Sequence, residues 1–367
     1  MMKRRDFLEH SSVFAAGLFL GCSGNTASAK KPSRQWFMPE EGEPHTRTWM
    51  AFGASNRIWG RRLLPEVRRN LAAIANTISR HEPVSMLVRD HELELARSLV
   101  DPAVELIVSP LDDLWVRDTG PTFVFDEQRE MAAVDFNFNG WGRKQAFARD
   151  AKVASFIAKR AQASVINTDL VLEGGCFEVD GHGTAIITES CVLNDNRNPG
   201  VSKAQFEDLF MPLLGLEKII WLPGIRGKDI TDGHTDFYAR FARPGVVLAA
   251  YDPDPASYDH EITWCHLDIL ESATDAAGNT LTVKTLEAPG ILRATYANDE
   301  FAAGYMGYYV CNGAVVMQEF GDSEADKAAR RTLQAVFPDR VVEQIALDGI
   351  AAGGGSIHCA TQQEPMA

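Results

Sequence analysis

Short apolar runs and segments with helical periodicity alternate along most of this chain. Runs of about four to eight mainly apolar residues between turn residues are typical of buried strands. They predict strands over 49–52, 84–88, 104–108, 219–223, 282–286, 309–317 and 341–346. Apolar side chains three or four positions apart predict helices over 63–78, 91–99, 146–161, 262–273 and 323–337. This alternation predicts an α/β fold.

Glycine turns predict two hairpins. Gly181 to Gly183 separates a strand predicted over 170–179 from one over 184–188, and Pro244-Gly245 precedes another over 246–250. No linker stands out after residue 30, so the sequence predicts a single domain over 30–367.

The first 29 residues have the layout of an export signal. A basic cluster containing Arg4-Arg5 precedes an apolar run over 13–20 and small residues that end at Ala29. This order is typical of a cleaved signal, and the run is too short to span a bilayer. The arginine pair resembles a twin-arginine signal, which predicts export to the periplasm. Lipid anchoring at Cys22 is the less favoured alternative.

Composition narrows the range of ligands. The chain has 367 residues and a formal net charge of −14, which disfavours a nucleic-acid partner and suits a cationic small molecule. Twin-arginine cargo folds in a reducing compartment, so we expect no disulfides. The sequence has no CxxC pair and no histidine spacing typical of zinc, and so it predicts neither a metal nor a cofactor. A homo-oligomer is compatible with it.

A cysteine near the C-terminus is the first candidate for chemistry. Cys359 follows closely after Gly353-Gly354-Gly355, and glycine lets the backbone take positive φ and approach a ligand. A nucleophilic thiol also needs an acid/base partner or an electropositive setting. The alternative is a buried cysteine on a short strand after a turn.

Three other segments carry candidate binding groups. Trp115 would offer an aromatic face to a cation and Asp118 a charged acceptor, although a surface salt bridge beside a core tryptophan would fit the same segment. Trp141 lies in a loop rich in aromatic and amide groups. Glu173, before a double glycine, is either a ligand residue or an ordinary edge charge.

His234 and Asp236 stand two positions apart in a segment expected to be extended. Alternate side chains of an extended chain point to the same side, so an acid/base group and a carboxylate would enter one pocket together. For an isolated His-x-Asp, a satisfied surface pair is the commoner outcome.

Taken together, these segments resemble the agmatine deiminase family. The motifs are Trp-x-Arg-Asp-x-Gly-Pro at 115–121, Glu-Gly-Gly at 173–175, Asn-x-Asn-Arg-Asn-Pro at 194–199, Gly-His-x-Asp at 233–236 and Gly-Gly-Gly-x-Ile-His-Cys-x-Thr-Gln-Gln at 353–363. The likeness covers about residues 38–365 in order. It implies a pentein fold, which is a five-bladed α/β propeller of ββαβ-like units with pseudo-fivefold symmetry around a central active site.

The resemblance also implies catalytic roles. Cys359 would attack the guanidinium carbon and form a covalent thiouronium. His234 would protonate the leaving ammonia and then activate water. Asp118 and Asp236 would clamp the guanidinium, and Glu173 would hold His234 or the water in place.

Further residues would serve binding or structure. Trp115, Trp141 and Gly354 would border the substrate, while His358 would be structural. Cys176 stands where the family pattern has serine and Arg143 where it has glycine, and both departures bear on substrate choice. A third departure is the export signal, which cytosolic agmatine deiminases lack.

The favoured substrate is agmatine, a small cationic guanidine that would give N-carbamoylputrescine and ammonia. The run Gly140-Trp141-Gly142 offers no charge to a substrate carboxylate, whereas Arg143 is close enough in sequence to reach one. A peptidylarginine deiminase or another guanidine hydrolase would use the same five catalytic residues. A papain-like peptidase would place its cysteine early, at a helix start. A non-catalytic periplasmic binder of cationic amines is the alternative from another class.

Overall fold

The computed structural model describes residues 36–367, and in this part of the chain the strands form five sheets with one repeated order. Each sheet contains an antiparallel pair whose second strand also pairs in parallel with a third. The sheets are β4 (Thr122–Phe125), β5 (Met131–Asp135) and β6 (Ser164–Asn167); β7 (Phe177–Val179), β8 (Thr184–Thr188) and β9 (Lys218–Leu222); β10 (Ala239–Arg243), β11 (Val246–Tyr251) and β12 (Thr282–Glu287); β13 (Tyr309–Cys311), β14 (Ala314–Glu319) and β15 (Val341–Ala346); and β16 (Thr361–Pro365), β1 (His45–Phe52), β2 (Val84–Val88) and β3 (Glu105–Val108).

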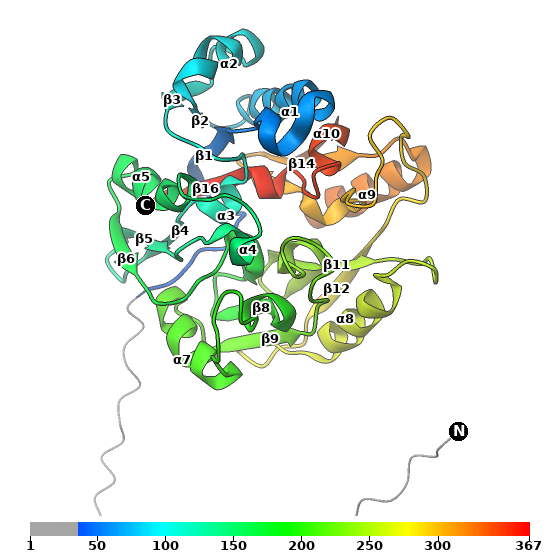
Figure 1. Ribbon diagram of the computed structural model, residues 1–367. Helices are drawn as coiled ribbons and strands as arrows, with labels where there is room; N and C mark the ends of the chain where they lie inside the picture. Colours follow the sequence, from blue (N-terminus) through cyan, green and yellow to red (C-terminus); the bar gives the residue numbers. More distant parts are fainter. Residues whose placement is uncertain (1–35) are drawn as a thin grey trace, which may run out of the picture. The chain divides into compact units, whose positions relative to one another are not determined.

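A helix connects the two parallel strands of each unit, because such strands need a crossover connection. The crossover helices are α5 (Val153–Arg160), α7 (Lys203–Leu214), α8 (His260–Ser272), α9 (Ser323–Val336) and α1 (Asn56–Ile78). Figure 1 shows them around the outside of the described unit, with α3 (Val116–Thr119) and α4 (Gly140–Arg143) near its middle. The remaining helices are α2 (Leu93–Leu99), α6 (Glu189–Val192) and α10 (Asp348–Ala351).

The two ends of the described chain meet in one sheet. β16 pairs antiparallel with β1, with Thr361 opposite Met50 and Gln363 opposite Thr48. Cys359 lies just before β16 and is therefore held against the first sheet. It belongs to the same buried cluster as Trp59, Trp115 and Trp141, so the candidate site borders the core beneath α1.

Most predicted strands are present, and three predictions are wrong in detail. Residues 170–173 form no strand, and only Phe177–Val179 joins the ladder as β7. The helix predicted over 146–161 begins as a 3-10 turn at Asp150 and is α-helical only over Val153–Arg160. The strand predicted over 309–317 is a hairpin, because Gly313 has a φ of 79° and turns the chain between β13 and β14.

The repeated ββαβ order agrees with the units that the family resemblance implies. The described residues belong to one compact unit, whereas the predicted signal, including Cys22, lies outside them. Across residues 36–367, no helix combines the length and the apolar character needed to cross a bilayer.

Candidate active site

A cavity of about 190 Å³ collects most of the residues that the sequence singled out. Six of the eight predicted site residues line it, namely Trp115, Asp118, Trp141, His234, Gly354 and Cys359. The other two, Glu173 and Asp236, are buried beside His234. The cavity is also lined by Asp113, Trp59 and Gln145, which the sequence analysis did not identify.

The triple glycine serves mainly to admit two tryptophans. Only Gly354 has a positive φ, of 85°. A Cβ at Gly353 would lie 2.2 Å from the ring of Trp59, and one at Gly355 would lie 2.3 Å from the ring of Trp115. The expectation that all three glycines serve close approach to a ligand is therefore corrected, since two of them make room for the aromatic wall.

Cys359 lies in a 3-10 turn, His358–Ala360, and not on a strand. Burial raises the pKa of its thiol well above the usual range, and the negative charges of Asp236 and Asp118 raise that pKa further. In the free enzyme the thiol is therefore protonated near neutral pH. A cation bound between these carboxylates would oppose this effect and favour the thiolate.

His234 and Asp236 face the site together, but for a different reason from the one predicted. Residues Thr235–Phe237 form a 3-10 turn, so the two side chains do not alternate along a strand. His234 Nδ1 lies 3.8 Å from Asp118 Oδ1 and 4.0 Å from Asp236 Oδ1, while Nε2 lies 3.2 Å from Glu173 Oε2. Neither residue forms the surface pair that was the alternative.

The carboxylates around His234 determine its charge. Burial lowers the pKa of His234, but the charge of Asp118 and hydrogen bonds with Cys191 and Glu173 outweigh it and raise the pKa well above its ordinary value. The side chain is therefore an imidazolium, with one N–H on the side of Asp118 and the other directed at Glu173. This is the protonation state that a proton donor requires.

Asp236 is held by a second histidine. His358 Nδ1 lies 2.6 Å from Asp236 Oδ2, and His358 Nε2 lies 2.8 Å from Glu41 Oε2. Glu41 in turn pairs with Arg240 and Arg117. The other oxygen, Asp236 Oδ1, accepts no hydrogen bond from any described residue, so it is free to accept one from a ligand.

Asp118 is fixed by the loop that carries Trp141. Trp141 Nε1 donates to Asp118 Oδ2 over 3.0 Å, and Gly175 N donates to Oδ1 over 3.2 Å. Trp141 has a φ of 53°, a strained value for a bulky side chain. Asn139 holds this turn by accepting a hydrogen bond from Gly142 N. Trp141 therefore does more than supply apolar surface.

The surface salt bridge considered for this segment is not formed. Arg117 is only 3% exposed, and it donates to Gln363 Oε1 and pairs with Glu41. Asp118 is likewise buried. The two neighbours therefore point to different partners, with Arg117 supporting the fold and Asp118 facing the cavity.

Gly175 marks the point where the polar groups converge. A Cβ at this position would lie 2.5 Å from His234 Nδ1, 3.0 Å from Asp236 Oδ2 and 3.2 Å from Asp118 Oδ1. The double glycine after Glu173 therefore leaves room for one imidazolium and two carboxylates to approach each other beside Gly175.

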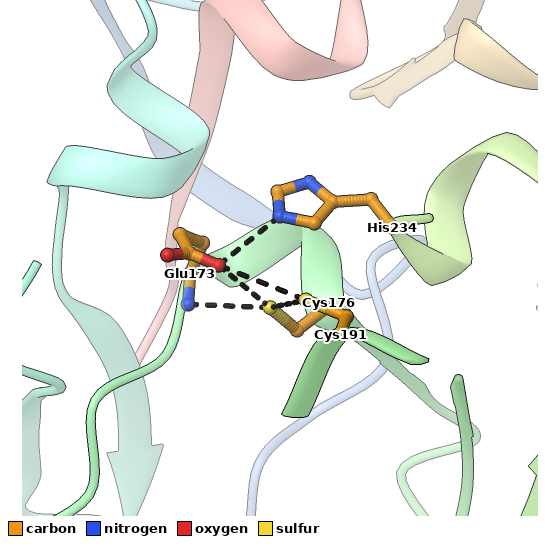
Figure 2. A group of neighbouring side chains, drawn as sticks. All are labelled: Glu173, Cys176, Cys191 and His234. Carbon is orange, nitrogen blue, oxygen red and sulfur yellow. Dashed lines mark hydrogen bonds and ion pairs between the residues drawn. The ribbon is translucent and has the colours of Figure 1, made fainter. Parts of the chain in front are cut away.

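Glu173 is held by an arginine that the sequence analysis did not single out. Arg197 Nε lies 2.8 Å from Glu173 Oε2 and 3.0 Å from Oε1, and its Nη1 lies 2.9 Å from Asp232 Oδ2. Burial raises the pKa of Glu173, but the charge of Arg197 and the contact with His234 outweigh it and lower the pKa to about 2. Glu173 is thus a permanent anion and not an edge charge. Figure 2 shows its carboxylate beside His234.

The two residues that depart from the family pattern do not line the cavity. Arg143 and Cys176 are both absent from its lining residues. Cys176 Sγ instead lies 3.0 Å from Glu173 Oε2 and 3.2 Å from Cys191 Sγ. An effect of either residue on substrate choice would therefore have to act without contact at the cavity wall.

Known proteins are similar to this chain in sequence and fold. The family model of the Porphyromonas-type peptidyl-arginine deiminase matches residues 37–365. The agmatine deiminase of Stutzerimonas stutzeri is 37% identical over 353 residues, covering 90% of this chain and 95% of that protein. A provisionally named agmatine deiminase of Streptomyces coelicolor is 42% identical over 337 residues, covering 89% and 98%. The solved agmatine deiminase of Enterococcus faecalis superposes with a TM-score of 0.84 at 31% identity, covering 90% and 96%.

Proposed function

Since this chain belongs to the Porphyromonas-type peptidyl-arginine deiminase family and acts on guanidino C–N bonds, we propose that its substrate is agmatine. The products are N-carbamoylputrescine and ammonia. The observation that carries the proposal is the charge of the cavity wall. Asp113 and Asp118 line it together with His234, and no lysine or arginine is among its described lining residues.

Agmatine is a dication, and the cavity offers anions to both of its ends. Asp118 and the unpaired Oδ1 of Asp236 accept hydrogen bonds from the guanidinium. Asp113 accepts hydrogen bonds from Trp59 Nε1 at 2.7 Å and from Gln145 Nε2 at 3.0 Å. It serves as the acceptor for the distal amine. Arginine or peptidyl-arginine would instead bring a carboxylate or peptide group to a cavity without a cation.

The first half of the reaction forms the covalent intermediate. The bound guanidinium offsets the charges of Asp118 and Asp236, so the Cys359 thiol loses its proton to solvent more readily than in the free enzyme. The sulfur attacks the guanidinium carbon and a C–S bond forms. The C–N bond then breaks, and His234 gives the leaving amine its proton from Nδ1. The product is ammonia and a thiouronium on Cys359.

The second half returns the enzyme to its starting state. His234, now neutral, takes a proton from water as the oxygen attacks the same carbon. The C–S bond breaks, and the leaving sulfur takes up the proton that the new hydroxyl group loses as the ureido carbonyl forms, which restores the thiol. Glu173 and its partner Arg197 hold His234 throughout, because the imidazolium is paired with a carboxylate that stays charged.

A comparison of substrates tests the proposal. We expect kcat/KM for agmatine to exceed the value for a peptide with C-terminal arginine, or for free arginine, by at least about 100-fold, because leaving a charge unpaired in a closed site costs several kcal/mol. Ammonia release and the ureido product are measured, with Cys359→Ala as the blank. A higher kcat/KM for the peptide would contradict the assignment and favour peptidylarginine deimination.

The charge of Asp113 should make the KM for agmatine depend on pH. Burial raises the pKa of Asp113 to about 6, so its carboxylate is charged above that pH and neutral below it. We expect KM for agmatine to rise as pH falls through about 6. Asp113→Asn should raise KM at pH 7.5 and abolish this dependence, with little change in kcat.

n-Butylguanidine, which lacks the distal amine, is the matched control substrate. Asp118, whose pKa burial also raises to about 6, affects both compounds equally, so the ratio of the two KM values isolates Asp113. A ratio that is the same in wild type and in Asp113→Asn would show that Asp113 does not bind the distal amine.

We also propose that the protein is exported through the twin-arginine pathway. The support is the order of the basic, apolar and small-residue regions over residues 1–29. Replacing Arg4 and Arg5 by lysine keeps the charge and should retain the protein in the cytoplasm, as measured by cell fractionation and immunoblotting. The Lys3→Arg variant is the control. Unchanged periplasmic accumulation of the double-lysine variant would contradict this route, and retention in the membrane fraction that is lost in Cys22→Ala would indicate a lipid anchor.

A further inference from the structure

Two buried thiols lie on the Nε2 side of His234. Cys176 Sγ is 3.2 Å from Cys191 Sγ and 3.0 Å from Glu173 Oε2, and His234 Nε2 is 3.2 Å from the same oxygen. Figure 2 shows these groups gathered around the Glu173 carboxylate. Neither cysteine lines the substrate cavity, and the reaction proposed above uses neither.

We propose that Glu173, Cys176, Cys191 and His234 form a binding site for Zn²⁺ or a similar soft divalent cation, and that the bound metal inhibits the enzyme. One donor atom from each residue lies within 4.8 Å of every other. Two thiolates, one imidazole and one carboxylate form a donor set that zinc prefers.

The separations of the donor atoms fit a tetrahedral ion. Bond lengths of about 2.3 Å to sulfur and about 2.1 Å to nitrogen or oxygen place tetrahedral ligands about 3.4 to 3.8 Å apart. The donor atoms lie from 3.0 Å apart, for Cys176 Sγ and Glu173 Oε2, to at most 4.8 Å apart, with Cys191 Sγ 3.9 Å from the same oxygen. Shifts of about 0.5–1 Å would therefore bring them to tetrahedral spacing.

The segments that carry the ligands are fixed to one another by other contacts. Thr188 N donates to Thr235 Oγ1 over 3.0 Å, and Thr235 Oγ1 donates to the carbonyl of Cys176 over 2.5 Å. Thr188 directly precedes α6, which carries Cys191, and Thr235 follows His234. The fold therefore brings the four ligands together from separate segments. For this reason the sequence shows no short metal-ligand spacing at this site.

Arg197 would balance the charge of the loaded site. Its side chain is fully buried, and it bonds both oxygens of Glu173. Oε1 can keep the guanidinium while Oε2 binds the metal. Two thiolates and a carboxylate carry three negative charges, which one divalent ion and Arg197 neutralise. A neutral cluster meets the requirement that buried charges be paired.

Metal binding would take over the atoms that position His234 for the reaction. His234 Nε2 lies 3.2 Å from Glu173 Oε2, and an ion bound to both atoms would replace that contact and hold the ring as a metal ligand. A His234 side chain held in this way would not be available as the acid of the reaction. This inhibitory consequence rests on the proposed function, whereas the binding of the metal does not.

The binding test uses the full-length Cys359→Ser chain, reduced and freed of metal, so that the active-site thiol cannot contribute. Zinc is titrated against a chromogenic chelator, and cobalt is added to record the absorption bands of a tetrahedral thiolate complex. We expect one ion per chain with a tetrahedral cobalt spectrum. Adding Cys176→Ser and Cys191→Ser should weaken zinc binding more than about 100-fold, while Cys265→Ser, at an exposed thiol, should change nothing.

The inhibition test uses the chain with Cys359 intact. Zinc should inhibit ammonia release and EDTA should restore it, and Cys176→Ser, which keeps a hydroxyl toward Glu173, should need more than about tenfold more zinc for half inhibition. Zinc binding that survives loss of both Cys176 and Cys191 but disappears in Cys359→Ser would overturn the proposal by placing the metal on the catalytic thiol. A Cys359→Ser chain without a tetrahedral cobalt spectrum would overturn it as well.

Discussion

Replacing Cys359 by alanine is expected to lower the rate of ammonia release from agmatine by at least about three orders of magnitude. The variant has no group that can form the covalent bond to the guanidinium carbon, and loss of a nucleophile usually costs this much. Cys359 lines the cavity with His234 and Asp118, so the substitution leaves the binding groups in place. Its kcat should therefore fall far more than its affinity for agmatine.

Cys265→Ala is the matched control for this variant, because Cys265 is an exposed thiol on α8. It should keep normal activity. Circular dichroism and thermal unfolding show whether the Cys359 variant is folded. If the folded Cys359→Ala protein retains more than about a tenth of the wild-type rate, Cys359 is not the nucleophile.

Asp236→Asn is expected to lower kcat/KM for agmatine by about two to three orders of magnitude. Loss of one partner of a buried charge pair costs about 3–5 kcal/mol. Asp236 Oδ1 accepts no hydrogen bond from the described residues, and Oδ2 contacts His358. Asparagine can keep its oxygen toward His358 Nδ1, so its amide N–H₂ would face the N–H groups of the substrate.

Asp275→Asn is the control for this variant, because Asp275 lies in a surface turn, where its carboxylate accepts hydrogen bonds from Asn279. It should leave kcat/KM unchanged. Agmatine affinity, measured by calorimetry in a Cys359→Ala background, separates weaker binding from slower chemistry. Turnover of a folded Asp236→Asn protein within about threefold of wild type would exclude the clamp.

Local signals in the sequence predict most of the scaffold. The strand over 84–88 and the helix over 63–78 are both present, as β2 and within α1. The apolar positions of each element mark the face that is buried, which is why the pattern predicts the element. The segment over 170–173 is apolar for another reason, because Leu170 and Leu172 pack into a core cluster without joining a ladder.

Long-range contacts explain what the sequence analysis missed at the site. Arg197 touches Glu173 from 24 positions away, and Glu41 reaches His358 across 317 positions. Asp113 shares the cavity with Cys359 only because β16 completes the first sheet. Pairings of this kind leave no periodicity or spacing in the chain, so only the folded structure reveals them.

His234 and Asp236 face the same site, as expected, but the extended backbone from which this was predicted is not present. Alternation along a strand would have put both side chains on one face. A 3-10 turn at Thr235–Phe237 brings them to the same spot instead. The spacing therefore indicated the partnership, whereas the backbone that creates it depends on Gly175 and on the hydrogen bond from Thr235 to Cys176.

The most direct test of covalent catalysis by Cys359 is to trap the intermediate. Enzyme turning over agmatine is quenched in acid within milliseconds, digested and analysed by mass spectrometry. If Cys359 is the covalent nucleophile, the peptide that contains it gains the mass of agmatine less ammonia, Cys359→Ser shows no such species, and the adduct disappears when agmatine is exhausted. Turnover without any adduct on Cys359 under conditions that trap one in a known thiouronium-forming enzyme, or an adduct on a different residue, would show that Cys359 is not the covalent nucleophile.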